Sequence, residues 1–351
     1  MRLSMLSASE VIEFRANLLD WFARHQRDLP WRRTRDPYAI WISEIMLQQT
    51  RVASVIPYYE RFLSRFPTFQ ALADAPEAEL LAHWAGLGYY YRARNLQKAA
   101  QVIREKGRFP TSYEEIRCLP GVGDYTAAAI ASIAFHLPHA ALDGNVFRVL
   151  SRMCDDATNI ASSAGRKHFA RIADELLDGT EPGMFNQAMM ELGATICLPN
   201  NPQCLLCPVA RFCGARASGR ENELPVKIVA TRSVEEHRTV FWIERGGALL
   251  LWQRAANSRL MPGFWELPER AQLPAVAVGR KLGSFRHGIT FHNYRFDVAE
   301  ASAPEDAGAC QWITLEVLAN LPLSTVLRKA KGVVGKYRAT NEPASIAAAS
   351  G

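Results

Sequence analysis

Apolar residues recur every three or four positions through most of residues 8–220, the spacing that lines one face of an α-helix. In Val11–Arg24 this apolar face consists of Val11, Phe14, Leu18, Trp21 and Phe22. The same pattern predicts helices at Ile40–Tyr59, Pro76–Trp84, Tyr91–Lys106, Thr126–Phe135, Asn145–Cys154, Gly165–Leu177 and Asn186–Cys197. Prolines and glycines between these segments separate one helix from the next. The N-terminal part of the chain is therefore expected to be all-α.

The pattern changes after residue 222. Residues 223–232 are polar, contain a proline and lack an apolar period, so we interpret them as a linker. Beyond them the pattern predicts strands at Val240–Ile243, Ala248–Gln253 and Tyr294–Val298, and helices at Leu315–Leu321 and Ser324–Lys336. We therefore expect an all-α domain in residues 1–222 and a smaller α+β domain in residues 233–338. The small and polar residues 339–351 are expected to form a disordered tail.

Composition narrows the class of protein further. The 351 residues are 48% hydrophobic and 22% charged, which excludes a wholly disordered chain. No apolar run reaches the roughly 18–20 residues that a membrane helix needs. Met1–Glu10 lacks the basic start and apolar stretch of a secretory signal, so we expect an intracellular protein. The net charge of +6 permits an acidic partner such as nucleic acid but does not show one.

Four of the seven cysteines lie close together in a Cys-x6-Cys-x2-Cys-x5-Cys pattern formed by Cys197, Cys204, Cys207 and Cys213. In a reducing compartment such crowding favours metal binding over disulfides, although four unrelated buried cysteines are the alternative. Thiolates select zinc or an iron–sulfur cluster, and the spacing does not match the paired ligands of common zinc fingers. We therefore predict an iron–sulfur cluster. Four protein ligands leave no open position, so its role is expected to be structural.

A short glycine-containing segment, Leu119–Thr126, precedes a helix of small residues. Gly121 and Gly123 allow a tight turn between two helices, so that backbone N–H groups at the start of the second helix can hold a DNA phosphate. An ordinary connection between helices is the alternative, because a single Gly-x-Gly is a weak signal.

Taken together, these motifs resemble a known family. The hairpin, the cysteine loop and Leu142–Val146 are similar to the endonuclease III superfamily of DNA glycosylases. The N-terminal segments narrow the resemblance to the adenine DNA glycosylases, the MutY family; these are Leu29–Arg32, Asp36–Tyr38, Trp41–Thr50 and Gly86–Tyr90. The match is dense over about residues 10–228. It implies a multi-domain protein: an all-α glycosylase core in residues 1–222 with a helix-hairpin-helix at about 113–135 and a [4Fe-4S] loop at 197–213, followed by a smaller α+β Nudix-like domain.

In that family the second domain reads 8-oxoguanine opposite the target adenine. Met261–Pro268 resembles the start of this Nudix-like domain. Glu269–Leu282 lacks the Glu-rich helix that binds magnesium, so pyrophosphatase activity is not expected. Where the family commonly has Phe-Ser-His, this chain has Ile289-Thr290-Phe291 in one register and Phe291-His292-Asn293 in another. The hydroxyl expected to sense the lesion is that of Thr290.

Release of adenine needs an acid for the leaving base and a carboxylate for the cationic sugar. Glu44 lies in the apolar run Ile40–Met46, where burial would keep it protonated, and the resemblance makes it the proton donor to adenine. Asp143 begins a helix and is expected to stay ionised and face the sugar, although a helix cap is its plainer role. Tyr125 and Asn145 are the supporting positions that the family implies.

The target base must leave the helical stack to reach such a site. By resemblance, Trp31, Arg32, Leu47 and Gln187 line the adenine pocket, with the Gln187 amide reading an adenine edge. Gln49 and Tyr89 are expected to act as wedges in the duplex. Core packing or surface exposure is the alternative for each of these residues.

The resemblance predicts a monofunctional adenine glycosylase of base-excision repair, acting as a monomer on duplex DNA with A:8-oxoguanine or A:G mispairs. We expect it in the bacterial cytoplasm, associated with the nucleoid. The alternatives are a thymine-mismatch enzyme or a bifunctional glycosylase/lyase of the same superfamily. Tyr125 occupies the position where the lyases have the lysine that forms a Schiff base, which disfavours lyase activity. A catalytically silent iron–sulfur protein that binds DNA is the alternative from another class.

Overall fold

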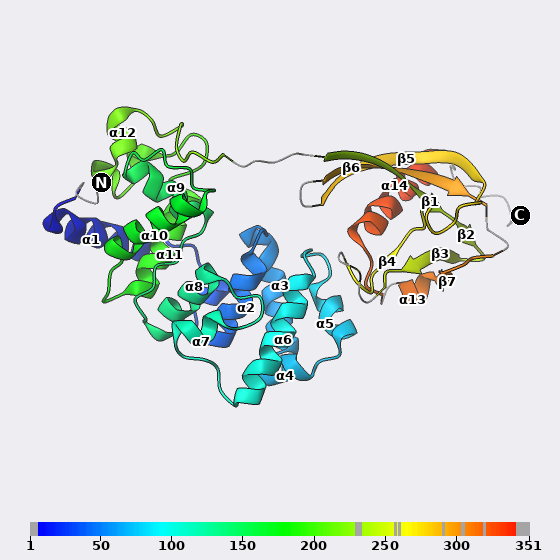
Figure 1. Cartoon of the computed structure of the whole chain (residues 1–351), viewed down its shortest axis with the longest axis horizontal. Coiled ribbons are helices and arrows are strands. Elements are labelled where there is room, and N and C mark those ends of the chain that lie inside the picture. Colours follow the sequence, from blue (N-terminus) through cyan, green and yellow to red (C-terminus); the bar gives the residue numbers. More distant parts are fainter. Residues whose placement is uncertain are drawn as a thin grey trace, which may run out of the picture. The chain divides into compact units, whose positions relative to one another are not determined.

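The computed structural model describes residues 6–228, 234–255, 258, 261–289, 292–302, 306–318 and 321–341 (Figure 1). The chain divides into two compact units. Unit 1 consists of Met1–Ala75 and Arg94–Val229, and unit 2 of Pro76–Ala93 and Ala230–Gly351. The described helices are too short or too polar for a transmembrane segment.

The described part of unit 1 is helical and contains no strand. Its elements are α1 (Ala8–His25), η1 (Pro30–Arg32), α2 (Pro37–Leu47), α3 (Val52–Arg65), α4 (Phe69–Asp74), α6 (Tyr91–Lys106, from Arg94 onward), α7 (Tyr113–Arg117), α8 (Asp124–Phe135), α9 (Gly144–Met153), α10 (Ser163–Leu176), α11 (Pro182–Thr195), η2 (Cys204–Leu206), η3 (Ala210–Phe212) and α12 (Gly214–Ser218). The prediction of an all-α region is therefore confirmed.

One predicted helix is wrong. The segment Ile40–Tyr59 forms two helices, because α2 ends at Leu47 and α3 begins at Val52. Between them Gln49 has the left-handed backbone conformation, with φ of 57°. The apolar spacing continues across this break, and neither glycine nor proline marks it, so periodicity alone does not predict it.

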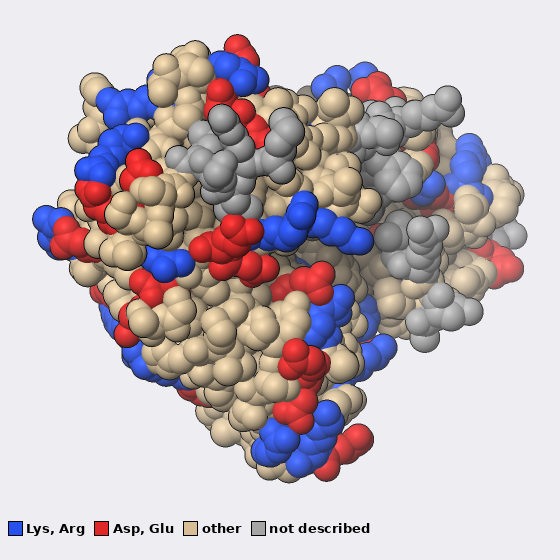
Figure 2. All heavy atoms as spheres, turned by 60° about the vertical axis from the view of Figure 1, so that its left-hand side comes forward, with Lys and Arg blue, Asp and Glu red and all other residues tan. Residues whose placement is uncertain are grey.

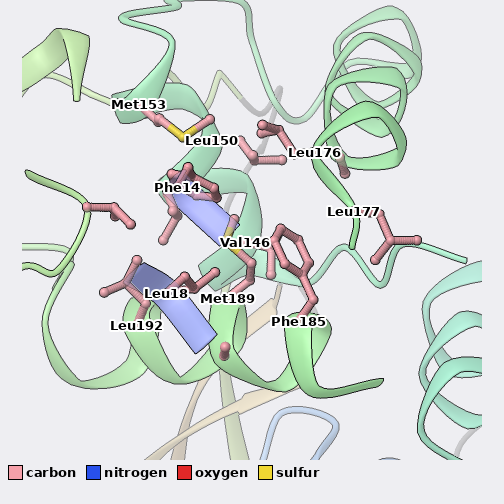
Figure 3. Packing of buried hydrophobic residues seen from close by; sticks show 14 of the residues in the cluster. Phe14, Leu18, Val146, Leu150, Met153, Leu176, Leu177, Phe185, Met189 and Leu192 are labelled. Carbon is pink, nitrogen blue, oxygen red and sulfur yellow. The ribbon is translucent and has the colours of Figure 1, made fainter. Parts of the chain in front are cut away.

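Helices α1, α9, α10 and α11 pack around one hydrophobic core (Figure 3). Phe14 and Leu18 come from α1, Leu150 from α9, and Phe185 and Met189 from α11. All five side chains are at most 3% exposed. Because α9 and α11 are held by this core, the polar residues on their other faces have a rigid support.

The hairpin between α7 and α8 turns at Gly121, where φ is 78°. A Cβ atom there would lie 2.7 Å from the Cβ of Asn95, so both conformation and space favour glycine. Gly123 is the N-cap residue of α8 and has open space around it. The structure thus contains the predicted turn, and its steric requirement falls on Gly121.

Unit 2 contains two sheets. The first has the order β1 (Val234–Trp242), β6 (His292–Ala301) and β5 (Val278–Ile289), in which β1 is parallel and β5 antiparallel to β6. In the second, β3 (Ala248–Gln253) pairs with β2 (Glu244–Arg245), β4 (Trp265–Glu266) and β7 (Cys310–Thr314). The described residues that follow β7 form the helices α13 (Leu315–Leu318) and α14 (Thr325–Asn341). The predicted strand and helix segments therefore exist, with α14 extending into residues 339–341.

Unit 2 also contains Pro76–Ala93, which carries α5 (Glu77–Trp84). Here the division departs from the boundaries expected from sequence. The Tyr90 ring lies 4.2 Å from the ring of Phe264, a long-range aromatic contact that sequence spacing does not reveal. Glu269–Leu282 contains turns and the start of β5 but no helix.

Candidate active site

A cavity of about 580 Å³ opens in unit 1 between η1, α2, α8, α9 and α11. It brings together the predicted site residues Trp31, Arg32, Glu44, Leu47, Gln49, Tyr125, Asp143, Asn145 and Gln187. It is also lined by residues that sequence reasoning missed, including Arg27, Ser43, Gln48, Met190 and Glu191. Residues from positions 27 to 194 thus converge on one concave, mixed polar and apolar site, the type that binds small organic groups.

Glu44 is the most buried acid on the α2 side of the cavity, with 6% of its surface exposed. Its pKa is raised to about 7, mainly by burial and also by the charge of Asp143. The hydroxyl of Tyr125, 2.8 Å from Glu44 Oε2, and the more distant Arg32 act in the opposite direction. Burial prevails, so Glu44 can hold a proton near neutral pH, as an acid catalyst must.

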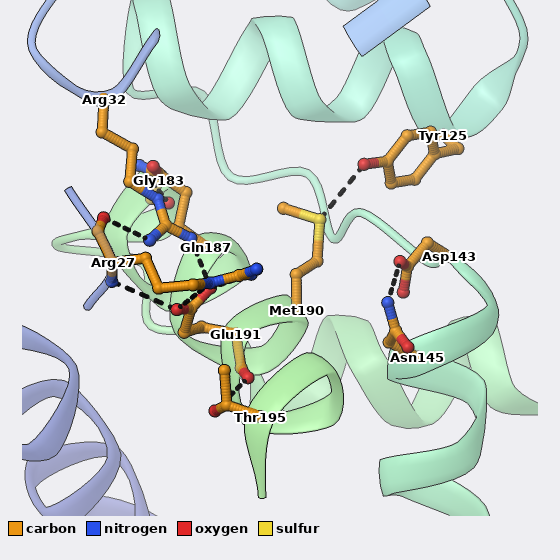
Figure 4. Close-up of polar contacts among 10 residues, drawn as sticks. All are labelled: Arg27, Arg32, Tyr125, Asp143, Asn145, Gly183, Gln187, Met190, Glu191 and Thr195. Carbon is orange, nitrogen blue, oxygen red and sulfur yellow. Dashed lines mark hydrogen bonds and ion pairs between the residues drawn. The ribbon is translucent and has the colours of Figure 1, made fainter. Parts of the chain in front are cut away.

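Asp143 is the N-cap residue of α9 and differs from Glu44 in its partners. Its Oδ1 accepts a hydrogen bond of 2.7 Å from the Val146 amide, and its Oδ2 accepts one of 2.9 Å from Asn145 Nδ2 (Figure 4). Burial outweighs these hydrogen bonds, so the pKa of Asp143 lies above its usual value. Both oxygens act as acceptors, so the ionised form is the one that this geometry satisfies.

Tyr125 lies between two acceptors. Its hydroxyl is 2.8 Å from Glu44 Oε2 and 3.1 Å from the sulfur of Met190, the contact drawn in Figure 4. Burial and the neighbouring carboxylates raise the pKa of Tyr125 well above its usual value. The phenol therefore stays protonated and serves as a hydrogen-bond donor.

Glu191 is a second buried glutamate, 1% exposed, on α11. Arg27 donates to both of its oxygens at 2.7 Å, and Arg32 Nη2 donates to Oε2 at 2.8 Å (Figure 4). Although burial raises it, these hydrogen bonds bring the pKa of Glu191 to about 2. Arg32 also donates to the carbonyl of Arg27 at 3.0 Å. Glu191 thus fixes two arginines at the cavity.

Gln187 lies one helical turn before Glu191 on α11, so both face the cavity. Its Nε2 donates to the carbonyl of Gly183 at 3.3 Å. This contact orients the amide within the pocket. The spacing between Gln187 and Glu191 is a signal by which sequence reasoning could have found Glu191.

Arg148 connects Asn145 to the cysteine loop. Its Nη2 donates to Asn145 Oδ1 at 2.8 Å and to the Gly193 carbonyl at 2.7 Å, while its Nε donates to the Cys197 carbonyl at 2.8 Å. Asn145 in turn holds Asp143. The position of Asp143 therefore depends on the loop that carries the cysteines.

The four cysteines Cys197, Cys204, Cys207 and Cys213 are partly buried and free of disulfides. Burial and, to a smaller extent, the charges of the three other thiols raise the pKa of Cys207 to about 12. Arg152 Nη1 lies 3.2 Å from the sulfur of Cys197. Within the described ranges, no three His, Cys, Asp or Glu side chains are placed to hold a single metal ion.

The remaining predicted residues lie outside this cavity. Gly121 and Gly123 belong to the hairpin, and Tyr89 belongs to unit 2, where it is exposed and has φ of 48°. Thr290 lies outside the described residues. On the face shown in Figure 2, Lys and Arg side chains stand beside Asp and Glu side chains, so surface charge alone does not mark a DNA-binding surface there.

Comparisons with known proteins point to one group. Residues 42–174 match the family model of the HhH-GPD superfamily of base excision DNA repair proteins. The adenine DNA glycosylase of mouse (Mus musculus) is 34% identical over 92% of this chain and 78% of its own length. The human (Homo sapiens) adenine DNA glycosylase is 38% identical over 78% of this chain and 60% of its own length.

Two solved structures are similar over the helical part of the chain. A thermostable thymine-DNA glycosylase is 31% identical, with a TM-score of 0.54, over 60% of this chain and 98% of that one. An endonuclease III–DNA complex is 24% identical, with a TM-score of 0.52, over 61% of this chain and 98% of that one. At this level of identity the second similarity shows the fold alone.

Proposed function

The chain belongs to the adenine DNA glycosylases of the HhH-GPD superfamily, and from this premise we propose that it releases adenine paired with 8-oxoguanine or guanine in duplex DNA. Its activity in base excision repair is hydrolysis of the N-glycosidic bond of adenine. The observation that best supports our assignment of the site is the contrast between Glu44 and Asp143 in one cavity. One carboxyl favours its proton, and the other is satisfied as an anion.

In this mechanism Glu44 donates its proton to a ring nitrogen of the flipped adenine, which makes the base a better leaving group. Asp143 faces the sugar and stabilises the positive charge that develops as the bond breaks. Asn145 keeps the Asp143 carboxylate in place through its 2.9 Å hydrogen bond. The base leaves, and a water molecule then adds to the cationic sugar and gives its extra proton to the ionised Glu44, so no covalent bond to the protein forms.

The adenine lies in this proposal between apolar and polar walls of the cavity. Trp31 and Leu47 supply apolar contact for the base, and the Gln187 amide offers a donor and an acceptor to its edge. Arg32 is held at the cavity by Glu191. Gln49, exposed and in a left-handed conformation at the break between α2 and α3, is proposed to enter the space that the base vacates.

Single-turnover incubation tests this function directly. Duplexes with A:8-oxoguanine, A:G and T:G are incubated with excess protein, and strand cleavage is compared with and without alkali. We expect alkali-dependent cleavage at adenine for the first two duplexes. Cleavage at T:G alone would identify a thymine-mismatch enzyme, and cleavage without alkali would identify a lyase. Binding without any base release would identify a catalytically silent protein.

The cysteine loop is proposed to hold one [4Fe-4S] cluster. The donor set fits, since four partly buried thiols stand in one loop, and burial and neighbouring thiols raise the pKa of Cys207 and Cys213. Cys197, Cys204, Cys207 and Cys213 would each hold the cluster through a thiolate. The cluster would hold the loop that supports Arg148 and Asn145. Cys204→Ser should lower the iron content and the brown absorbance; full iron and activity in this variant would contradict the proposal.

Recognition of the opposite base is proposed for unit 2, with the hydroxyl of Thr290 as the group that senses the lesion. Truncation after Lys227 should leave adenine release measurable but reduce the preference for 8-oxoguanine over guanine. One lost hydrogen bond is worth about 0.5–1.5 kcal/mol, or about three- to tenfold in preference. Rates for both duplexes at fixed salt test this, and an unchanged preference would assign another role to residues 233–338. Thr290→Val is the matched variant in the full chain.

A further inference from the structure

The hydroxyl of Tyr125 has two acceptors but only one hydrogen. Glu44 Oε2 lies at 2.8 Å and Met190 Sδ at 3.1 Å, so the O–H can satisfy one of them at a time. Figure 4 shows Met190 extending from α11 toward this hydroxyl. A thioether is a weak acceptor and carries no charge. The protonation state of Glu44 therefore decides which acceptor receives the Tyr125 hydrogen bond.

When Glu44 is ionised, its carboxylate is the stronger acceptor and takes the Tyr125 hydrogen. When Glu44 is protonated and its O–H faces adenine, its oxygen is a weaker acceptor for Tyr125 than the carboxylate is. The tyrosine hydrogen can then turn to the sulfur of Met190, the second acceptor within reach among the described residues. The two protonation states thus correspond to two orientations of one hydroxyl.

We propose that Met190 is a positioning residue for acid catalysis, because its sulfur holds the Tyr125 hydroxyl while Glu44 carries the proton. As that proton passes from the Glu44 oxygen to a ring nitrogen of adenine, the Tyr125 O–H turns from sulfur to the new carboxylate. The O–H bond of Tyr125 remains intact, and only one proton changes its atom. The turn stabilises the negative charge on Glu44 at the moment when it forms. The proposal rests on the role of Glu44 proposed above.

Other groups around Glu44 are unchanged by a substitution at Met190. Asp143 faces Glu44 from the start of α9, and Arg32 faces it from η1. Glu191 follows Met190 on α11 but is neutralised by Arg27 and Arg32. Leucine in place of methionine preserves volume and removes only the sulfur acceptor. A change in the pH profile of Met190→Leu therefore reports on the hydroxyl.

The test is the pH dependence of single-turnover adenine release with saturating protein, from about pH 5.5 to about pH 9. In Met190→Leu the hydroxyl has only Glu44 left, which favours ionised Glu44. The rate of release declines at alkaline pH as Glu44 loses its proton, and we call this decline the alkaline limb. In Met190→Leu the limb should shift to lower pH by about half a unit, since a weak hydrogen bond is lost. Release should slow about threefold above the limb and stay unchanged below it. The matched control is Met189→Leu, a change in the core beside it, 2% exposed, which should leave the limb in place.

A second comparison separates this role from simple packing. In a Tyr125→Phe background the hydroxyl is absent, so adding Met190→Leu should no longer move the limb. A shift that persists without the hydroxyl, or a Met190→Leu rate lowered equally at every pH, would overturn the proposal. If the unaltered protein releases no adenine at any pH, the proposed function fails instead, and that outcome is distinct.

Discussion

The α2 and α11 walls of the same cavity each carry a buried glutamate, and the two behave in opposite ways. Glu44 is 6% exposed and has its pKa raised to about 7, whereas Glu191 is 1% exposed and has its pKa lowered to about 2. Burial opposes ionisation in both. The difference comes from the partners, a phenol for Glu44 and two guanidinium groups for Glu191. Burial alone therefore does not decide the charge of a carboxyl in this protein.

The contrast divides two tasks. Glu44 has no cation in hydrogen-bonding contact among its described partners and can give up a proton, as a reacting acid must. Glu191 remains an anion throughout and serves as an anchor for Arg27 and Arg32. Glu44 can therefore transfer a proton, whereas Glu191 stays ionised and only holds the two arginines. A substitution of Glu44 should consequently impair catalysis, and a substitution of Glu191 should lower stability.

The largest expected effect is on catalysis. Glu44→Gln preserves the size of the side chain and removes the transferable proton, so adenine release should fall by about 10²–10⁴-fold. Binding to an A:8-oxoguanine duplex should remain, because the substitution removes only the transferable proton. Single-turnover rates and duplex affinities measure the two quantities separately. Release within a few fold of the unaltered protein would remove Glu44 from the acid role.

Glu191→Gln should act on stability instead. It leaves two arginines beside a neutral amide, and loss of one partner of a buried ion pair lowers the free energy of unfolding by about 3–5 kcal/mol. Urea unfolding followed by helical circular dichroism measures this change. Glu13→Gln is the control, since its ion pair with Arg211 is largely exposed and should contribute little. Equal effects of the two substitutions would mean that Glu191 is no anchor.

Sequence reasoning predicted the buried, protonated Glu44 but missed the buried, ionised Glu191. The apolar run around Glu44 predicts a buried helix, and burial of its carboxyl follows. Glu191 also stands in a largely buried helix, but its charge depends on arginines more than 150 residues away in the chain. Periodicity describes a single helix and cannot show such long-range pairs. The same limit explains the missed Tyr125–Met190 contact and the missed break at Gln49.

Other parts of the site were predictable because their causes are local. An aspartate directly before a helix is a strong N-cap signal, and Asp143 does cap α9. The Gly121 turn follows from a backbone conformation that glycine adopts easily. The positions of the longer helices of unit 1 follow from apolar spacing, apart from the break between α2 and α3, whereas the short helices α4, α7 and α12 were not predicted. The roles of Tyr89 and Thr290 stay predictions, since one lies in unit 2 and the other outside the described residues.

The two glutamates should also give opposite dependences of stability on pH. The folded-state pKa of Glu44, about 7, exceeds the ordinary 4.5, so its contribution is complete below about pH 4.5 and is lost as pH rises through about 7. The contribution of Glu191 is complete above about pH 4.5 and is lost as pH falls toward about 2. In the unaltered protein the free energy of unfolding should fall by up to about 3 kcal/mol as the pH rises from about 5 to about 8, and Glu44→Gln should abolish this fall. Unfolding curves across this range test it, and parallel curves for both proteins would contradict the raised pKa.

The smallest expected effect separates the two arginines. Arg27 is 39% exposed at its side chain and Arg32 is 11% exposed, so solvent screens the Arg27 pair more strongly. Arg27→Gln should therefore lower the free energy of unfolding by only about 1 kcal/mol, because Arg32 still neutralises Glu191. With one guanidinium lost, the pKa of Glu191 should rise, and the stability lost on acidification should begin at a higher pH than in the unaltered protein. The alkaline limb of adenine release should stay in place, since Arg27 does not contact Glu44. A loss as large as that of Glu191→Gln would show that Arg27, despite its exposure, is the partner on which the anchor depends.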